Sequence, residues 1–281
     1  EREAEDALHR AVQASRLQLV INAHEPGALS VVSFSPDGKH VVSAASDETV
    51  KIWDVATGER MLKLDGRFAT YSPDGGQLAV VLPDGTVRMF DPLMRKQIQA
   101  AGQIDAKLSV AFSPDGLRLL TVAYGNLPKV WDPKTGRELV AFPGHTDFVG
   151  SAVFSPDGRR ILTASDDGTA RVWDAKGGAQ LLELGGHRGF VWSAAFSPDG
   201  KRIATASGNE AHIWDAGSGK ELFTLTAHKN EVFAVAFSPD GARLATGSLD
   251  RTVKVWDAAS GDELFTLAGH NGTVYGLAFS P

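Results

Sequence analysis

Residues 154–174 decide how this chain folds. They read Phe-Ser-Pro-Asp-Gly-Arg-Arg-Ile-Leu-Thr-Ala-Ser-Asp-Asp-Gly-Thr-Ala-Arg-Val-Trp-Asp. Two short apolar runs are bounded by Pro-Asp-Gly and Asp-Asp-Gly, a pattern that indicates strands joined by tight turns. Pro156 presets φ for the first corner, Asp157 tolerates the second, and Gly158 can leave the turn with positive φ. The stretch therefore predicts a turn, a strand, a tight turn and a second strand ending at Trp173-Asp174.

The same unit recurs along most of the chain. An aromatic-Ser-Pro block begins, in steps of 37, 41, 42, 42, 41 and 42 residues, at Phe34, Tyr71, Phe112, Phe154, Phe196, Phe237 and Phe279. A Trp-Asp pair follows, with Phe90-Asp91 in its place once, at Trp53, Trp131, Trp173, Trp214 and Trp256. Four strands in a period of about 40–45 residues, with Gly-His and Trp-Asp, are typical of WD repeats. The sequence thus resembles the WD-repeat β-propeller family, and the resemblance covers residues 17–281.

Composition limits the kind of protein. The chain has 281 residues, which suit one large domain or two small ones, and the repeat favours one continuous array. Its net charge is −6, with both signs mixed through every repeat, so we do not expect a nucleic-acid partner. The absence of Cys excludes disulfides and thiolate metal sites and fits a reducing compartment, so we expect a cytoplasmic protein. No apolar run has membrane-spanning length, and no membrane partner is expected.

The first 16 residues differ from the rest because they contain no Gly or Pro and many helix formers. We interpret residues 1–16 as a short helical linker or, alternatively, as the last helix of an upstream signalling module. Such a preface is similar to bacterial multidomain signalling proteins that carry WD-repeat modules. The chain begins at Glu1 and stops in a Ser-Pro turn at Pro281, so we expect other domains in the same polypeptide.

The resemblance implies an all-β propeller of four-stranded antiparallel blades around a central channel. We expect six complete blades plus parts of a seventh over residues 17–281. The first blade should contain strands at residues 29–34, 40–46, 49–54 and 60–64, and the second should begin near Arg67 after a shortened loop. Later blades should begin near Lys107, Phe148, Phe190 and Val232. Residues 17–21 and 274–279 would supply the outermost and innermost strands of an incomplete seventh blade; a longer or tandem array is the alternative.

Polar residues recur at fixed offsets from each Trp. The resemblance implies that they form buried hydrogen-bond chains from indole through hydroxyl and imidazole to carboxylate, so that no buried polar group lacks a partner. The third of the four sets lacks its Asp because the turn there is one residue shorter. The sets are His24, Ser43, Asp47 and Trp53; His145, Thr163, Asp167 and Trp173; His187, Thr205 and Trp214; and His228, Thr246, Asp250 and Trp256.

A hydroxyl, an imidazole and a carboxylate also suit a nucleophile, its base and an orienting group. A catalytic site is needed only once, whereas this set occurs complete three times, and Thr replaces Ser freely. We therefore expect no catalytic residue and no enzymatic activity. No loop matches a Ca²⁺ site and no Gly-rich loop precedes a helix, so no metal and no cofactor are expected. His40 and His212 are expected on solvated strand faces.

The resemblance implies a rigid, non-enzymatic scaffold or sensor module for protein or peptide partners within a larger signalling protein. Positions six and four before the aromatic of each Ser-Pro block should lie at the channel mouth, where family members contact partners. Aromatic residues gather at these positions in the later repeats, and clustered exposed aromatics are typical of interfaces. The predicted partner-binding residues are Phe148, Phe190, Trp192, Glu231, Phe233, Thr273 and Tyr275. A small-molecule sensor that uses the central channel is the alternative.

Overall fold

The structure is a computed structural model that describes residues 29–92, 96–105, 109–122 and 127–280. The predictions for residues 1–16, for residues 17–21 and for His24 lie outside the described residues. Within the described ranges the regular elements are all strands. They form six antiparallel four-stranded sheets, which we call blades 1 to 6 in chain order.

Each blade uses four strands that follow one another along the chain. Blade 1 contains β1 (Leu29–Phe34), β2 (His40–Ala45), β3 (Thr49–Asp54) and β4 (Arg60–Asp65); blade 2 contains β5 (Phe68–Tyr71), β6 (Leu78–Val81), β7 (Thr86–Asp91) and β8 (Lys96–Asp105). Blade 3 contains β9 (Ser109–Phe112), β10 (Leu119–Val122), β11 (Lys129–Trp131) and β12 (Glu138–Ala141); blade 4 contains β13 (Val149–Phe154), β14 (Arg160–Ser165), β15 (Ala170–Asp174) and β16 (Gln180–Leu184). Blade 5 contains β17 (Val191–Phe196), β18 (Arg202–Ser207), β19 (Glu210–Asp215) and β20 (Glu221–Leu225); blade 6 contains β21 (Val232–Phe237), β22 (Arg243–Ser248), β23 (Thr252–Asp257) and β24 (Glu263–Ala268).

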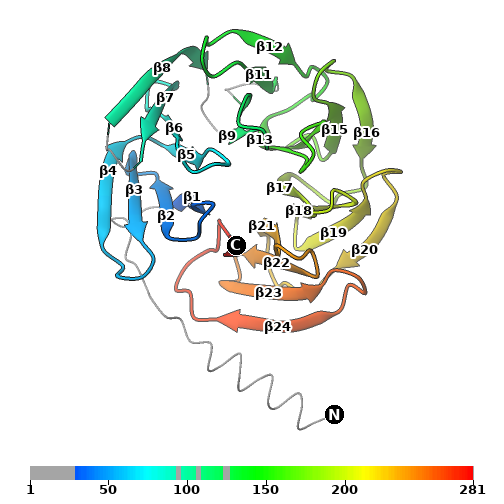
Figure 1. Cartoon of the computed structure of the whole chain (residues 1–281). Coiled ribbons are helices and arrows are strands. Elements are labelled where there is room, and N and C mark those ends of the chain that lie inside the picture. The colour runs from blue at the N-terminus through cyan, green and yellow to red at the C-terminus, as the bar shows by residue number, and fades with distance from the viewer. Residues whose placement is uncertain (1–28, 93–95, 106–108, 123–126, 281) are drawn as a thin grey trace.

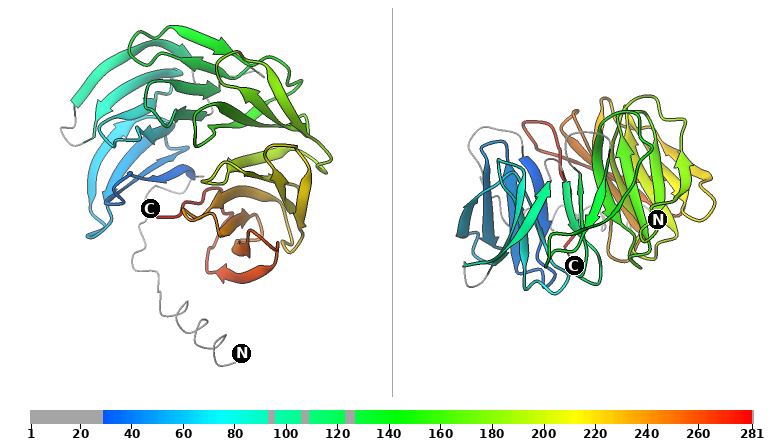
Figure 2. Two further views of the ribbon diagram at one scale, coloured as in Figure 1. Left: turned by 45° about the vertical axis from the view of Figure 1, so that its right-hand side comes forward. Right: turned by 90° about the horizontal axis from the view of Figure 1, so that it is seen from above.

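The blades are arranged around a common centre, as in a β-propeller (Figure 1). The first strand of each blade faces this centre and the fourth forms the rim (Figure 1). Consecutive inner strands contact one another from β1 through β5, β9, β13 and β17 to β21. Figure 2 shows the blades standing side by side around the centre.

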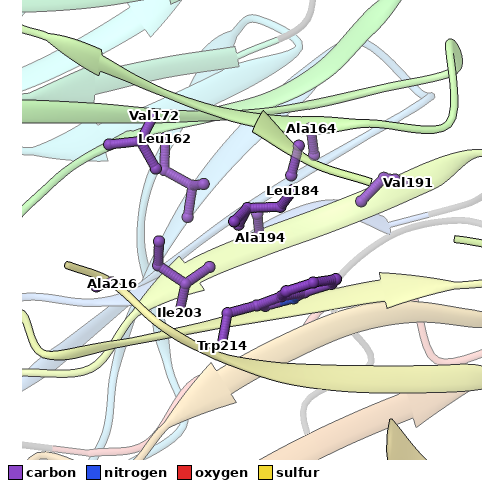
Figure 3. Close-up of a cluster of buried hydrophobic side chains, with 10 residues drawn as sticks. Leu162, Ala164, Val172, Leu184, Val191, Ala194, Ile203, Trp214 and Ala216 are labelled. Carbon is purple, nitrogen blue, oxygen red and sulfur yellow. The ribbon is translucent and has the colours of Figure 1, made fainter. Parts of the chain in front are cut away.

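The hydrophobic core lies between blades. Figure 3 shows one such interface, where Leu162, Val172 and Leu184 of blade 4 meet Ile203 and Trp214 of blade 5. A four-stranded sheet of this size cannot bury both of its own faces, so each blade depends on its neighbour for a core. The repeated Trp therefore contributes mainly to the contact between blades.

The Ser-Pro-Asp-Gly turns form the local structure that the sequence predicts. In blade 4, Ser155 Oγ donates to Asp157 Oδ1 at 2.6 Å, and the same carboxylate oxygen accepts the Arg159 backbone N–H at 3.0 Å. Gly158 leaves the turn with a φ of 67°, a conformation that glycine adopts without strain. The Asp of each block is thus a turn residue.

Arginine side chains connect neighbouring blades below these turns. Arg160 of blade 4 donates to the backbone oxygens of Gly200 at 2.7 Å and Ala216 at 2.6 Å, both in blade 5. Arg118 of blade 3 reaches Gly158 of blade 4 in the same way, at 2.8 Å. These charge-assisted hydrogen bonds fix the angle between consecutive blades as well as adding to stability.

Most predicted strand bounds agree with the structure within a residue. The strand predicted at residues 40–46 ends at Ala45, and the one predicted at 60–64 continues to Asp65. Residues 274–279, in contrast, do not form the predicted regular strand. A strand requires a hydrogen-bonded neighbour along its length, and here the described residues provide only one bond, from the Val274 N–H to Ser248 O at 3.1 Å. The seventh blade therefore stays a prediction.

Candidate functional site

The predicted hydrogen-bond chain is complete in blade 4. Trp173 Nε1–H donates to Thr163 Oγ1 at 2.9 Å, and that hydroxyl lies 2.7 Å from His145 Nε2. The other ring nitrogen, His145 Nδ1, lies 2.7 Å from Asp167 Oδ2. The same chain recurs in blade 6 at nearly the same distances, through Trp256, Thr246, His228 and Asp250. It links the third strand to the loop that precedes the inner strand.

The carboxylate at the end of each complete chain is stabilised in its charged form. Burial raises the pKa of Asp167, but hydrogen bonds from Thr169, His145 and the Thr146 backbone outweigh it and lower that pKa to about 2. Burial also lowers the pKa of His145, although the bond to Asp167 opposes that change. The two effects together favour a neutral imidazole beside an ionised carboxylate, as a structural hydrogen-bond chain requires.

The described residues show parts of the same chain in blades 1 and 3, and His24 of the blade 1 set lies outside them. In blade 1, Trp53 donates to Ser43 at 2.9 Å, while Asp47 accepts from Thr49 and lies 3.6 Å from Lys51 Nζ. In blade 3, Trp131 donates to Thr121 at 2.8 Å, a pair that the sequence analysis did not include. The ten-residue offset between hydroxyl and Trp was sufficient to find it.

Blade 2 replaces the polar chain with apolar contacts. The hydroxyl position holds Val80 and the Trp position holds Phe90. A β-carbon on Gly66 would lie 2.5 Å from Val80 Cγ1, so only glycine fits at the end of this shortened loop. Replacing all partners of a buried hydrogen-bond chain by apolar groups leaves no orphan, which explains why this blade tolerates the loss.

In blade 5 a backbone oxygen takes the place of the missing Asp as the partner of His187. His187 Nε2 lies 2.9 Å from Thr205 Oγ1, but its Nδ1 pairs with the backbone oxygen of Gly168 at 3.1 Å. The prediction that His212 is solvated is wrong, because this side chain is buried and its ring centroid lies 5.0 Å from that of His187. His212 lies opposite Thr205 on the neighbouring strand, and because His187 contacts that same threonine, the two imidazole rings meet.

These chains are badly placed for chemistry. The hydroxyls of Thr163, Thr205 and Thr246 are fully buried, and each already accepts a hydrogen bond from an indole N–H. A nucleophile must reach its substrate, so none of the three can act as one in this conformation. Among the described residues no cluster of His, Asp or Glu could hold a metal ion.

A β-bulge repeats at the start of the inner strand in blades 1, 4, 5 and 6. In blade 5, Val191 pairs with Ser207 and Ser193 pairs with Ala206, so that Trp192 is the extra residue. Phe233 is the extra residue in blade 6 and Gly150 in blade 4. Bulges re-aim side chains away from the ladder. The residue four positions before the block aromatic is therefore the bulged residue in each of these four blades.

The aromatic side chains at and beside these bulges contact one another in a row. The ring centroids of Phe190 and Trp192 are 5.5 Å apart, those of Trp192 and Phe233 are 5.0 Å apart, and those of Phe233 and Tyr275 are 5.1 Å apart. Phe190 is 49% exposed and Tyr275 is 45% exposed, while Trp192 and Phe233 are half-buried. We call these four residues the aromatic arc. It crosses from blade 5 through blade 6 to the segment that follows β24.

The remaining predicted partner-binding residues flank the arc. Phe148 is half-buried in blade 4, where a β-carbon built on Gly150 would lie 3.9 Å from Phe148 Cε1. Glu231 is exposed before β21, and Thr273 is half-buried before Val274. Blade 2 differs, because Arg67 near the start of its inner strand forms an ion pair with Glu48 of blade 1.

Comparison with known proteins defines the class to which this architecture belongs. The profile of the family described as WD domain, G-beta repeat, matches residues 15–54, 136–174, 178–215 and 219–257, which together make up more than half of the chain. The chain therefore belongs to the WD40 repeat family. Proteins of this family generally mediate protein–protein interactions and are generally non-enzymatic.

Individual relatives match over shorter stretches. Autophagy-related protein 16 of Arabidopsis thaliana is 30% identical over 129 residues, which are 44% of this chain and 25% of that protein. Coronin-7 of Mus musculus is 40% identical over 81 residues, or 27% of this chain and 9% of that protein. A guanine nucleotide-binding protein subunit beta of Solanum tuberosum is 32% identical over 124 residues, or 40% of this chain and 33% of that protein. The matched stretches thus span a third or less of each relative.

The described residues contain no helix that is both long and apolar enough to cross a membrane.

Proposed function

We propose that this chain is a non-enzymatic platform that binds a protein or peptide through the aromatic arc. We further propose that it serves as the scaffold or sensor module of a larger signalling protein in the cytoplasm, as in bacterial multidomain regulators. Membership of the WD40 repeat family supports the coarser part of this proposal, because such repeats generally mediate protein–protein interactions. The absence of a basic stripe in the sequence argues against nucleic acid as the partner.

One observation carries the assignment to the arc. Four large rings that contact one another remain partly exposed, although the bulge position in blade 1 is occupied by Ser30 and in blade 4 by Gly150. Packing of the inner strand therefore does not require an aromatic there. Exposed aromatic clusters are typical of binding hot spots, since they bury much apolar area at small cost in conformational entropy.

The proposal is tested by selecting binders and asking where they bind. A displayed library of random peptides is selected against the wild-type chain, and the Kd of enriched peptides is measured on the wild type and on Trp192→Ser/Phe233→Ser. Loss of either large aromatic from a hot spot should weaken binding by at least about thirtyfold, which corresponds to about 2 kcal/mol or more. The matched control is Leu181→Ser, because Leu181 is an exposed apolar residue on the rim strand β16. Peptides with the same Kd for the wild type and for Trp192→Ser/Phe233→Ser would show that the binding site lies elsewhere.

We also propose that a seventh blade covers the outer face of blade 6. The leucine near the end of the fourth strand is 0% exposed at Leu184 and 2% at Leu225, yet the equivalent Leu267 is 46% exposed. Val274 already packs against this face, where a β-carbon on Gly247 would lie 2.7 Å from Val274 Cγ1. Arg243 occupies the position from which Arg160 reaches the next blade, but its side chain is exposed.

The segment after Val274 also approaches blade 1. A β-carbon on Gly276 would lie 3.4 Å from Val32 Cγ1, so residues 274–279 run between blade 6 and blade 1 as an inner strand would. The test extends the chain with a second copy of residues 240–257 after Pro281, which continues the Phe-Ser-Pro sequence with two middle strands. We expect a higher melting temperature, and we expect Leu267→Asp to be costly only in the extended chain. An extension that stays unfolded and leaves the melting temperature unchanged would contradict the proposal.

A further inference from the structure

Blade 6 has an acidic residue, Glu231, at the position where blades 4 and 5 have an aromatic ring. The Leu249 N–H donates to Glu231 O at 2.8 Å, and the Asp166 N–H donates to Phe148 O at the same distance. These equivalent bonds show that the backbone of Glu231 has the same place in blade 6 as the backbone of Phe148 has in blade 4. The side chain six before the block aromatic therefore starts from the same position in both blades.

In blades 4 and 5 this side chain lies beside the bulge residue. The ring of Phe148 contacts the open position above Gly150, and the ring of Phe190 contacts Trp192. By the same backbone geometry the side chain of Glu231 starts next to the bulge residue Phe233, whose ring contacts those of Trp192 and Tyr275. An exposed acidic residue therefore stands next to the bulge position in the middle of the arc.

No cation within the described residues neutralises this carboxylate. Arg188, in the loop that carries Phe190, lies 3.5 Å from Glu210, and Arg67 pairs with Glu48 on blade 1. Glu231 itself has no ion pair among the described side chains.

A second acidic site lies in blade 4 beside Phe148, which flanks the arc. Asp147 is exposed and Asp166 half-buried, and the Asp166 backbone is bonded to that of Phe148. Burial raises the pKa of Asp166, and the neighbouring carboxylates of Asp147 and Asp167 raise it further. Acidic residues therefore occur both beside the middle of the arc, at Glu231, and beside Phe148 on its blade 4 side.

We propose that the arc binds an arginine side chain of its peptide partner, with the guanidinium stacked against Trp192 and Phe233 and paired with Glu231. This inference rests on the proposed function. A guanidinium is planar and weakly hydrated, so it can stack on a ring and still give two parallel hydrogen bonds to a carboxylate, whereas an ammonium is compact and strongly hydrated. The chain already stacks guanidinium groups on aromatic rings. Arg118 Cζ lies 5.2 Å from the ring centroid of Phe154, and Arg160 Cζ lies 5.1 Å from that of Phe196.

The test uses a small probe and a signal that belongs to the arc alone. Five of the six Trp residues precede an Asp in the repeat pattern, and Trp192 is the sixth. Its indole N–H signal in an ¹⁵N NMR spectrum is assigned as the one that disappears in Trp192→Phe. N-acetyl-arginine methylamide is then titrated against the full chain, with N-acetyl-citrulline methylamide as the uncharged probe of the same shape and N-acetyl-lysine methylamide as the second cation.

We expect the arginine probe to shift the Trp192 signal with an affinity about three- to tenfold higher than the citrulline probe, and higher than the lysine probe. Glu231→Gln should abolish the preference for arginine over citrulline, while Asp166→Asn should leave most of it. The five other indole signals report whether each variant is folded.

Equal affinities of the arginine and citrulline probes would overturn the guanidinium inference and leave the arc as a binding surface. A preference that survives Glu231→Gln but is lost in Asp166→Asn would overturn the placement of the cation at Glu231. Failure of every probe to move the Trp192 signal would also overturn the inference, and the peptide selection described above then decides the proposed function separately.

Discussion

Thr163→Val tests whether the buried hydrogen-bond chain stabilises the blade. Valine has nearly the shape of threonine, and Thr163 is fully buried, so the change removes one hydroxyl with little change in packing. Two groups then lose their partner: the indole N–H of Trp173 at 2.9 Å and the Nε2 of His145 at 2.7 Å. An orphaned buried polar group costs about 1–3 kcal/mol, so we expect the free energy of unfolding to fall by about 2–6 kcal/mol.

The assay is urea unfolding followed by circular dichroism, with the unfolding free energy compared between variants. Trp173→Phe removes the indole donor, so the double variant Thr163→Val/Trp173→Phe should lose less than the sum of its two single changes. Blade 2 gives the reason, because its residues at these two positions, Val80 and Phe90, have no polar side-chain group that needs a partner. A loss below about 0.5 kcal/mol for Thr163→Val, or strict additivity in the double variant, would refute the reasoning.

Three further predictions concern the interfaces between blades and the blade 5 histidines. Trp173→Ala should reduce the unfolding free energy by about 3–5 kcal/mol because this large side chain is 1% exposed, and Trp173→Phe should reduce it by less. Overlapping urea curves for the wild type and Trp173→Ala would disprove the burial argument. Burial and the neighbouring His212 lower the pKa of His187 to about 4. Between about pH 6.5 and about pH 4 this imidazole is therefore protonated in the unfolded chain but neutral in the folded chain. The free energy of unfolding should consequently fall by roughly 2–3 kcal/mol as the pH drops through that range. His187→Gln should flatten the pH dependence of stability in that window, and an unchanged slope would contradict the assignment. Arg160→Met should cost about 2–4 kcal/mol because two backbone oxygens lose a charged donor, whereas the exposed Arg243→Met should stay within about 0.5; equal melting temperatures for the two variants would count against the interblade role.

The sequence by itself determined the repeating local structure. Pro156, Asp157 and Gly158 specify a turn through their own backbone preferences, and the structure confirms it with the bond from Ser155 and the positive φ of Gly158. The bond between Trp173 and Thr163 was equally accessible, because the two residues lie on adjacent strands of one hairpin and are only ten residues apart. Features that depend on one repeat unit could be predicted because each repeat contains all of their parts.

Contacts between repeats were decided only by the tertiary structure. Leu225 and Leu267 occupy equivalent positions, yet one is buried and the other is 46% exposed, because the exposure of each depends on the blade packed against it. The burial of His212 also required the packed structure, because its ring lies against those of His187 and Trp214 within blade 5. The aromatic arc joins Trp192, Phe233 and Tyr275, each about one repeat further along the chain, and their ring distances follow from the angle between blades. No local propensity encodes that angle, which is set by side chains that meet only when the blades pack.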